Sequence, residues 1–396
     1  MRGLGFDAMK LAVVMGAGLS GKAAKDLLED EGWNVTVLDG AAPWPEGDFS
    51  LAVASPGVPL DHPWQVAARE RGVKVISELE LGWRRWRTIG RTLAVTGSKG
   101  KSSVVKLIAS AMAMTGRMDA VACGNYGVPL SEVALRFRPR DGFEPWAVVE
   151  VSSFQMETTG FFHPDAAACL NLQEDHLDRH GSVEKYHALK LKLLDMAKMR
   201  VEADPSWDAE ISGSYFDNDI LRPNAEMACA LLAAAGLTRA EVRAGLAGFT
   251  PLPHRFETVL SRDGVTYIDD SKATSLAALA AGVKMAVSRG FGGCIRLIAG
   301  GLEKGDSPKD VISCLQSGVK KVYLIGHCAN QLFGAWSAAV PCEVCGTLDR
   351  AVESARREAR AGDAVLLSPG TASFDQFKSY GARGDAFAAY AKEEKR

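Results

Sequence analysis

Short apolar runs alternate with apolar residues at helical spacing along the whole chain. Residues 11–15, 35–38 and 93–95 form such runs, and each is followed by a glycine-containing or polar turn. Helical periodicity follows the first and third of these turns. Strands that alternate with helices are typical of βαβ units, so the pattern predicts an α/β protein built on parallel sheets.

Residues 91–105 show the pattern of a strand, a loop and the start of a helix. Gly97 and Gly100 allow the backbone N–H groups to turn inward, and the positive end of the new helix adds to the attraction for a polyphosphate. Lys101 would neutralise phosphate oxygens, and the Ser102 hydroxyl could hold Mg²⁺. Val95 occupies the place of the first glycine of the usual phosphate-loop pattern, so an ordinary β–α turn is the alternative.

A second glycine-rich turn, Gly16-Ala-Gly18-Leu-Ser-Gly21, follows the first apolar run. The next run ends at Asp39, which completes the dinucleotide-binding fingerprint. The same turn would hold any diphosphate, including that of UDP, and a turn without a ligand is the alternative. Further strands are predicted at 51–54 and 73–76, and the first leads into a turn at 55–59.

Composition limits the classes of function. The chain has 396 residues, 47% apolar and 24% charged, with a formal net charge of -2, which predicts two to three domains and no general attraction for nucleic acid or anionic lipid. We expect a cytoplasmic protein, because no signal peptide or membrane-spanning segment is evident. The Trp- and Arg-rich residues 83–87 are interpreted as a helix end and linker rather than a nucleic-acid surface. The eight cysteines are expected to be free thiols, with Cys342 and Cys345 as a weak candidate metal or redox pair.

Polar groups gather after two strands predicted near residues 147–151 and 167–170. Glu150 ends the first, where a carboxylate is well placed for Mg²⁺. Residues 171–180 after the second are dense in ionisable groups and include His176, although a solvated loop with one structural histidine is the alternative. Lys190 lies in a helical pattern that, by itself, predicts a surface lysine.

The last part of the chain, from about residue 250, repeats the strand and helix pattern. Polar groups follow or end its apolar strands at 253–257, 267–275, 297–305 and 365–377. Because sites in open α/β sheets form at the carboxyl ends of strands, these groups could converge on one cleft. Surface positions for Lys272 and Lys304 are the alternative.

The order of these motifs resembles the Mur ligase family along nearly the whole chain. The similarity is greatest to the members that add D-glutamate. The matching segments are Thr96-Gly-Ser-Lys-Gly-Lys-Ser, Gly124-Asn-Tyr-Gly, Glu150-Val-Ser-Ser-Phe-Gln-Met-Glu157, Asp175-His-Leu-Asp-Arg-His, Tyr186 to Lys190, His254-Arg255, Asp270-Ser-Lys-Ala-Thr, Gly300-Gly-Leu-Glu-Lys-Gly and Leu367-Ser-Pro-Gly-Thr-Ala-Ser-Phe-Asp-Gln-Phe377.

The resemblance implies three α/β domains. These are a Rossmann-like domain for the UDP substrate (1–89), a P-loop ATPase-type domain (90–250) and a Rossmann-like amino-acid domain (251–396). It further implies a monomer whose substrates are ATP, UDP-N-acetylmuramoyl-L-alanine and D-glutamate. The implied reaction passes through an acyl phosphate, and spreading charge on a transferring phosphoryl group explains why cations and backbone N–H groups dominate the motifs.

The resemblance also assigns roles to residues. The implied catalytic residues are Lys101, Glu150, His176 and Lys190; two Mg²⁺ ions are implied, with Ser102, Glu150, His176 and a carbamylated Lys190 as ligands. Nucleotide contacts are implied for Gly97, Ser98, Lys99, Gly100, Lys101, Ser102, Ser103, Asn224, Arg255, Asp270 and Lys272. Substrate contacts are implied for Gly16, Gly18, Leu19, Ser20, Gly21, Asp39, Ser55, Gly57, Asn125, Ser152, His176, Thr274, Lys304, Ser373, Phe374 and Tyr380.

Several positions depart from the family pattern. The chain between Lys190 and Asn224 is short, and Ile220 and Leu221 replace an expected histidine and asparagine. Lys99 and Ser275 occupy places where asparagine is usual, and Gly40 and Ala41 stand where polar residues often bind uracil. Two alternatives follow: a ligase for another amino acid, such as L-glutamate, or another acceptor, and a non-catalytic nucleotide-binding protein on the same fold.

Overall fold

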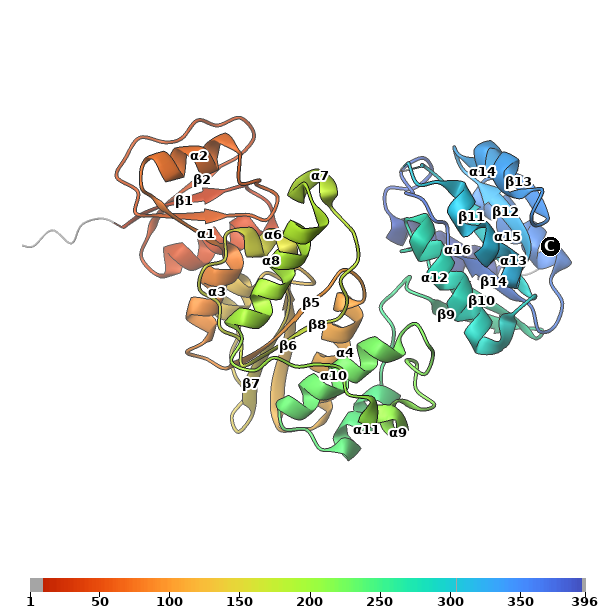
Figure 1. Cartoon of the computed structure of the whole chain (residues 1–396), viewed down its shortest axis with the longest axis horizontal. Helices are drawn as coiled ribbons and strands as arrows, with labels where there is room; N and C mark the ends of the chain where they lie inside the picture. The colour runs from red at the N-terminus through yellow and green to blue at the C-terminus, as the bar shows by residue number, and fades with distance from the viewer. Residues whose placement is uncertain (1–9, 304, 394–396) are drawn as a thin grey trace, which may run out of the picture. The chain divides into compact units, whose positions relative to one another are not determined.

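The structure, a computed structural model, describes residues 10–303 and 305–393, and these residues form three sheets (Figure 1). The predicted site residue Lys304 therefore lies outside the described residues. The chain divides into two compact units, one holding residues up to 217 and from 221 to 249, the other holding residues 218–220 and those from 250 onward. The first unit contains two of the sheets and the second contains the third.

The N-terminal sheet is parallel, with strand order β2-β1-β3-β4. Its elements are β1 (Leu11–Met15), α1 (Leu19–Asp30), β2 (Asn34–Leu38), β3 (Leu51–Ala54), α2 (Pro63–Glu70), β4 (Lys74–Ser77) and α3 (Glu78–Trp86). Strand β1 lies between β2 and β3, so the connections from these strands diverge there. Such a reversal of strand order opens a crevice beside the glycine-rich turn that follows β1.

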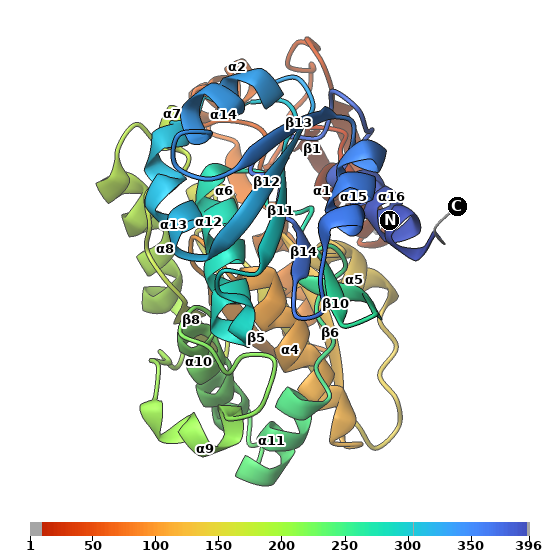
Figure 2. The ribbon, with the colours of Figure 1, turned by 90° about the vertical axis from the view of Figure 1, so that its right-hand side faces the viewer.

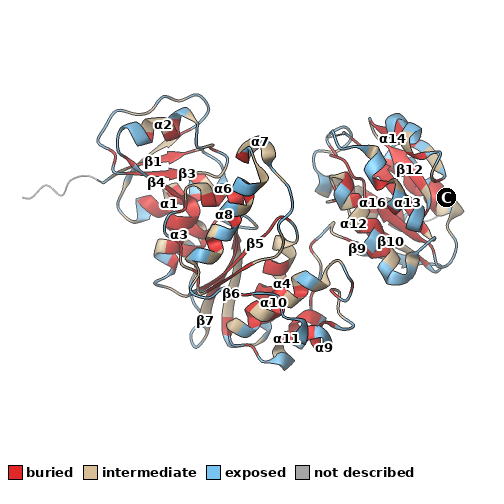
Figure 3. Cartoon of the chain, viewed as in Figure 1, coloured by how far each residue is buried: buried red, intermediate tan, exposed pale blue. Residues whose placement is uncertain are grey.

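The central sheet is also parallel, with order β6-β7-β5-β8. Its strands are β5 (Arg91–Thr96), β6 (Met118–Gly124), β7 (Glu144–Glu150) and β8 (Ala166–Cys169). The helical segments are α4 (Lys101–Met114), α5 (Leu130–Arg136), α6 (Ser153–Glu157), α7 (Leu177–His180), α8 (Val183–Met196), η1 (Pro205–Trp207), α9 (Asp208–Ile211), α10 (Arg222–Ala234) and α11 (Arg239–Ala247). Strand β5 is central and buried on both faces (Figure 3), as its run of apolar residues requires.

Two apolar clusters cover the faces of the central sheet. One joins α4, α10 and α11 through residues such as Ile108 and Leu231. The other joins α3, α5 and α8 through Trp86, Val133 and Leu193. Trp86 is both fully buried and the last residue of α3, so the prediction of a helix end at residues 83–87 is confirmed.

Helix α3 links the N-terminal sheet to the central sheet. The buried carboxylate of Glu78 accepts a hydrogen bond from the backbone N–H of Ser131 at 2.7 Å, and burial raises the pKa of Glu78 to about 7. A Cβ atom on Gly82 would lie 2.5 Å from the Ser131 nitrogen, so α3 and α5 touch through their backbones. This close approach fixes the N-terminal sheet to the central one.

The C-terminal sheet has the order β13-β12-β11-β14-β10-β9, and only the β9–β10 pair is antiparallel. Its strands are β9 (Glu257–Arg262), β10 (Val265–Asp269), β11 (Ile295–Gly300), β12 (Val319–Ile325), β13 (Cys342–Gly346) and β14 (Ala364–Leu367). Its helical segments are α12 (Leu276–Ala286), η2 (Val287–Phe291), η3 (Pro308–Val311), α13 (Ile312–Gly318), α14 (Ala329–Trp336), α15 (Leu348–Glu358) and α16 (Tyr380–Lys392). Helices α15 and α16 cover one face, and α12, α13 and α14 lie on the other (Figure 2).

Two broad expectations can be compared with this fold. All eight cysteines are free thiols, which confirms that prediction. Across the described ranges, 10–303 and 305–393, no helix combines the length and the apolar character needed to cross a membrane.

The contact at Gly82 makes a stability prediction. Gly82→Ala should destabilise the first unit by about 1–3 kcal/mol, because the methyl group would overlap the backbone of α5. Gly57→Ala is the matched control, since a Cβ atom there would meet nothing within 4 Å. Thermal unfolding of the two variants measures the difference, and equal stabilities would contradict the close packing of α3 on α5.

Candidate functional site

The loop between β5 and α4 has the geometry of an anion-binding turn. Gly97 and Gly100 adopt positive φ angles of 141° and 87°, a region that other residues rarely enter. Gly100 is the N-cap of α4, and among the described residues no side chain caps this helix. The first N–H groups of α4 therefore face the loop, where a phosphate would satisfy them.

A second loop, after β8, holds the loop between β5 and α4 in place. We call residues 97–100 of that first loop the phosphate loop, after its predicted role. Asn171 accepts hydrogen bonds from the backbone N–H groups of Ser98, through its carbonyl at 2.9 Å, and of Lys99, through its side chain at 2.8 Å. The Ser98 hydroxyl donates to the Gln173 carbonyl at 2.9 Å and accepts from the Tyr186 hydroxyl at 3.1 Å. These hydrogen bonds hold the backbone of the loop in its shape. Asn171 and Gln173 lie in the predicted polar segment 171–180, but their role in holding this loop was not predicted.

Two lysines share one acceptor at this loop. Lys101 Nζ and Lys190 Nζ donate to the Gly97 carbonyl oxygen at 2.8 and 2.9 Å. Lys190 is only 2% exposed, so its interpretation as a surface lysine was wrong. Burial, with a contribution from the Lys101 charge, lowers the pKa of Lys190 to about 8. Near pH 8, therefore, Lys190 carries a neutral amine in a substantial fraction of the molecules.

The reason for this burial lies in the spacing of helix α8. Tyr186, Lys190 and Leu193 are its buried residues, and they repeat at intervals of four and three. Residues at this spacing share one face of a helix. An aromatic residue and a leucine on the same face as Lys190 were the signal that could have placed this lysine inside.

Glu150, at the end of β7, carries the clearest feature for a cation. Its side chain is buried, and Oε1 accepts a hydrogen bond from Asn125 Nδ2 at 2.8 Å. Its other oxygen, Oε2, has no hydrogen-bond partner among the described residues. A buried carboxylate oxygen without a donor suits Mg²⁺, which prefers oxygen ligands. The residues present therefore fit a magnesium ion at Glu150.

The other predicted metal ligands lie around the same loop. Ser102 is in the first turn of α4, and Lys190 is beside Gly97. His176 is half exposed, has a φ angle of 53° and begins α7, with its ring 4.9 Å from the Phe154 ring and 6.2 Å from the Tyr186 ring. His176 therefore lies beside Tyr186, whose hydroxyl contacts Ser98 of the loop.

Residues near His176 connect the central sheet to the turn after β3 in the N-terminal sheet. Arg179 donates to both oxygens of Glu157 and to the carbonyl oxygens of Pro56 and Val58. His180 is buried, with Nε2 3.0 Å from the Ser153 hydroxyl and burial lowering its pKa. Arg179 thus positions the turn after β3, a role that the sequence alone did not predict.

The glycine-rich turn after β1 is also sterically demanding. Gly16 has a φ angle of 98°, and a Cβ atom on Gly21 would lie 1.8 Å from the Gly16 carbonyl oxygen. The predicted residues that follow β1, β2 and β3 share this edge of the parallel sheet: Gly16, Gly18, Leu19, Ser20, Gly21, Asp39, Ser55 and Gly57. Leu19 is 78% exposed at the start of α1, where an apolar side chain could cover a ligand.

Three further predicted residues take defined places in the first unit. Asn224, in α10, lies against the phosphate loop, because a Cβ atom on Gly100 would come within 2.4 Å of its Nδ2. Ser152 caps α6 in a capping box with Gln155, and Ser103 lies in α4. Asn224, for which the family resemblance implies a nucleotide contact, is thus beside the loop, even though the chain before it is short.

In the second unit, the predicted residues Asp270 and Lys272 follow strand β10. The Asp270 carboxylate accepts hydrogen bonds from the Ser368 hydroxyl at 2.8 Å and the Phe256 N–H at 3.2 Å, and burial raises its pKa to about 7. Lys272 Nζ lies 4.0 Å from the centre of the Tyr380 ring. Predicted nucleotide and glutamate residues are therefore neighbours here.

The remaining predicted glutamate residues lie on the same edge of the C-terminal sheet. Ser373 is buried, Phe374 is 71% exposed and Thr274 precedes α12. A fully buried guanidinium, that of Arg383, donates to Ser271 and to the carbonyl oxygens of residues 371 and 372. The loops after β10 and β14, which carry the predicted residues, are thus joined.

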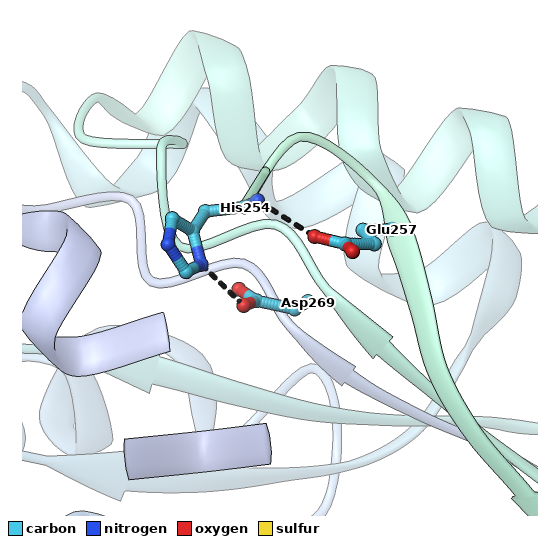
Figure 4. A group of neighbouring side chains, drawn as sticks. All are labelled: His254, Glu257 and Asp269. Atoms are coloured by element: carbon cyan, nitrogen blue, oxygen red, sulfur yellow. Dashed lines mark hydrogen bonds and ion pairs between the residues drawn. The ribbon is translucent and has the colours of Figure 1, made fainter. Parts of the chain in front are cut away.

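His254, Glu257 and Asp269 form a tight group next to Arg255 along the chain: His254 directly precedes Arg255, and the two acids follow it (Figure 4). Asp269 Oδ2 lies 2.7 Å from His254 Nδ1, and Glu257 accepts the His254 backbone N–H at 3.1 Å. Their candidate ligand atoms lie within 4.8 Å of one another. Since each carboxylate already has a partner within the group, we interpret it as a structural clasp. It holds the left-handed backbone of His254 and Phe256, at φ angles of 61° and 50°, on either side of Arg255.

Comparisons with known proteins agree on one family. The model of the "Mur ligase middle domain" matches residues 95–204, and that of the "Mur ligase, glutamate ligase domain" matches residues 254–370. A UDP-N-acetylmuramoylalanine–D-glutamate ligase of Nitratidesulfovibrio vulgaris is 33% identical over 423 residues, covering 96% of this chain and 95% of that protein. The protein of the same name from Acidobacterium capsulatum is 33% identical over 450 residues, with 96% and 95% covered.

A solved structure gives the same answer for the fold. The MurF ligase of Thermotoga maritima, in complex with ADP, superposes with a TM-score of 0.61 at 14% identity and covers 97% of this chain and 95% of that one. At this identity the likeness concerns the α/β fold with parallel sheets alone.

The environment of Asp270 predicts a pH dependence of stability. Its pKa rises from 3.8 to about 7 on folding, so the native state keeps a proton that the unfolded chain releases in this window. Stability of the second unit should therefore fall as pH rises from 4 to 7. Asp270→Asn should reduce this fall by at least about 1.4 kcal/mol, the equivalent of one pKa unit.

Thermal unfolding at pH 5 and 7.5 measures the effect. Asp385→Asn is the control, since the Asp385 side chain is 80% exposed. A pH dependence in Asp270→Asn equal to that of the unaltered chain would contradict the burial of this carboxyl group.

Proposed function

Because the chain belongs to the Mur ligase family, we propose that it is the ATP-dependent ligase that joins D-glutamate to UDP-N-acetylmuramoyl-L-alanine in peptidoglycan precursor synthesis. The observation that carries this conclusion is the similarity to D-glutamate ligases over 96% of the chain. The substrate and ATP are cytoplasmic metabolites, so the enzyme would act in the cytoplasm. A monomer remains our prediction for its state in solution.

Three domains are part of this proposal: a Rossmann-like domain at 1–89, a P-loop ATPase-type domain at 90–250 and a Rossmann-like amino-acid domain at 251–396. Each range contains one of the three sheets, which supports the division. The boundary of the two compact units after Phe249 supports the second border. The contact of α3 with α5 means that the first two domains would act as one body.

The reaction fits the inventory of side chains. A carboxylate oxygen of the acceptor attacks the γ-phosphorus of ATP, which releases ADP and leaves an acyl phosphate. The amine nitrogen of glutamate then attacks the acyl carbon, inorganic phosphate leaves, and the amine loses a proton. The Lys101 ammonium and the first N–H groups of α4 would stabilise the negative charge that spreads over the transferring group.

Glu150, Ser102, His176 and Lys190 would hold the two Mg²⁺ ions implied by the family. Bound Mg²⁺ supplies positive charge to the phosphate oxygens. Support for this assignment is the unpartnered Oε2 of Glu150 and the place of Ser102 at the start of α4. Asn125 orients Glu150 by its hydrogen bond and would also lie near the substrate carboxylate.

Lys190 would serve as a carbamate. Its neutral amine attacks carbon dioxide, a carbon–nitrogen bond forms, and a proton is released, which turns a cation into an oxygen ligand. The lowered pKa of about 8 supports this step, because only the neutral amine reacts. The buried position beside Gly97 would place the new oxygens at the phosphate loop.

The amino-acid pocket is proposed at the far end of the chain. Lys304 would pair with the side-chain carboxylate of glutamate, although it lies outside the described residues. Ser373, Thr274, Phe374 and Tyr380 would complete the pocket. Support comes from their common position after the strands of the C-terminal sheet and from the names of the relatives, which specify D-glutamate.

A panel of amino acids tests the function directly. With UDP-N-acetylmuramoyl-L-alanine and ATP, D-glutamate should support phosphate release at least about 10-fold faster than L-glutamate or D-aspartate. Lys101→Ala should reduce the rate at least about 10²-fold, because it removes a cation that acts on the transition state. Lys106→Ala, five residues further along the same helix, is the control.

A preference for L-glutamate would replace the amino-acid assignment, and a rate that depends on another acceptor would replace the acceptor assignment. A normal rate in the Lys101→Ala variant would contradict the assignment of this loop to the phosphates of ATP. Binding of ATP with no turnover on any member of the panel would favour the non-catalytic alternative.

The carbamate is tested by chemical rescue. Lys190→Ala should lose at least about 10²-fold in rate and regain part of it with acetate or propionate, which can supply carboxylate oxygens in place of the carbamate. Lys192→Ala is the matched control, since Lys192 Nζ donates to the Met156 and Thr159 carbonyl oxygens and belongs to another face. A fully active Lys190→Ala variant would contradict the second metal position.

A further inference from the structure

A groove on the outer edge of the N-terminal sheet shares Glu157 with the site described above but none of the predicted site residues. Strand β4, helix α2 and the segment after α6 line it, and its volume is about 480 Å³. Strand β4 is the last strand of its sheet, so one of its edges has no neighbouring strand among the described residues. All of these elements belong to the first compact unit.

Gln65 is the most informative side chain of the groove. It is 1% exposed, and its Nε2 atom has no hydrogen-bond partner among the described residues. A buried donor left without an acceptor destabilises the folded state. The neighbouring buried residues of α2, Trp64 and Ala68, are apolar, so packing alone does not require an amide here. The position points to an acceptor atom that the amide would meet.

The two acidic side chains that line the groove, Glu80 and Glu157, already have hydrogen-bond or ion-pair partners within the protein. Glu80 accepts hydrogen bonds from Arg84 and from the N–H groups of Gly160 and Phe161. Glu157 is paired with Arg179 at 2.6 Å. Each of these two carboxylates is thus matched by an arginine of its own, and the Glu80 charge also acts on Lys192.

Three cations line the groove from three different elements. Arg69, on α2, donates one N–H to the Leu60 carbonyl oxygen at 2.9 Å, which leaves most of its five donors available. Lys192, on α8, donates to two carbonyl oxygens and has a third N–H. Lys74, on β4, is exposed. The groove is thus rich in donors and in positive charge.

The backbone of β4 adds a further donor. The Ser77 N–H points away from β3, since it donates to the Thr158 carbonyl oxygen at 3.1 Å. Backbone groups two residues apart in a strand point the same way, so the N–H of Val75 also faces outward, on the side of the groove.

We propose that this groove is a binding site for a small ligand with carboxylate or phosphate oxygens, held by the Gln65 amide and the Arg69 guanidinium. A planar guanidinium with free donors is well suited to either oxyanion. Lys74 and Lys192 would add charge. The proposal does not depend on the ligase activity, and the groove lies apart from the phosphate loop in its lining residues.

Isothermal titration calorimetry of the full chain with two probes tests it. Succinate represents the carboxylate source, and inorganic pyrophosphate represents the phosphate source. Arg69→Ala should weaken the binding of at least one probe 10-fold or more. Arg71→Ala is the matched control: Arg71 donates to Ala67 and lies 5.9 Å from the centre of the Trp44 ring, and it does not line the groove.

Gln65→Leu provides a second reading. It should weaken the same probe at least 10-fold and raise the melting temperature of the free protein, because the unpartnered buried amide is gone. The probe that loses affinity in Arg69→Ala identifies the oxyanion source. Equal affinities of both probes for Arg69→Ala, Arg71→Ala and the unaltered chain, or no binding of either probe, would overturn the proposal.

Discussion

The carbonyl oxygen of Gly97 is the acceptor on which the phosphate-loop site depends. Lys101 and Lys190 both donate to it, although they come from different helices. Gly97 itself takes a φ angle of 141°, which a side chain would make costly. The loop backbone, the start of α4 and the buried face of α8 are thereby fixed around one atom.

Local patterns were sufficient to predict most of the elements. The strand predicted at 51–54 is β3 without change, and the strand predicted at 73–76 is β4 displaced by one residue. Gly16 in the first turn, and Gly97 and Gly100 in the second, take positive φ angles that other residues rarely adopt. Periods of two and 3.6 residues, together with glycine, are local properties, and they can be read without knowledge of the fold.

Features that depend on tertiary contacts could not be predicted in the same way. The burial of Lys190 requires α8 to pack against the phosphate loop, and the pairing of Arg179 with Glu157 joins residues 22 positions apart. The clasp of His254 and Asp269 also depends on strand β10 lying beside the start of the second unit. Each of these polar groups looks like a solvated side chain in sequence, because only packing removes it from water.

The shortened segment before Asn224 shows how a departure can be absorbed. Alignments with the relatives are longer than this chain, so the relatives contain residues that it lacks. Even so, the Asn224 amide lies beside Gly100, because Leu231 and Met227 pack helix α10 into the same apolar cluster as α4. Apolar packing of the helix, rather than the length of the connection, sets the place of the asparagine.

The two lysines at Gly97 cannot be tuned independently. Their like charges repel, which is part of the reason that the pKa of Lys190 is lowered to about 8. A phosphate beside Lys101 would offset this repulsion and raise the pKa of Lys190, which favours its charged form. A carbamate on Lys190 would instead place a negative charge next to Lys101 and strengthen the hold of the loop on that ammonium. In the proposed mechanism, nucleotide and carbon dioxide would therefore both act on the charge of Lys190, and the one that binds first would change the protonation state that the other meets.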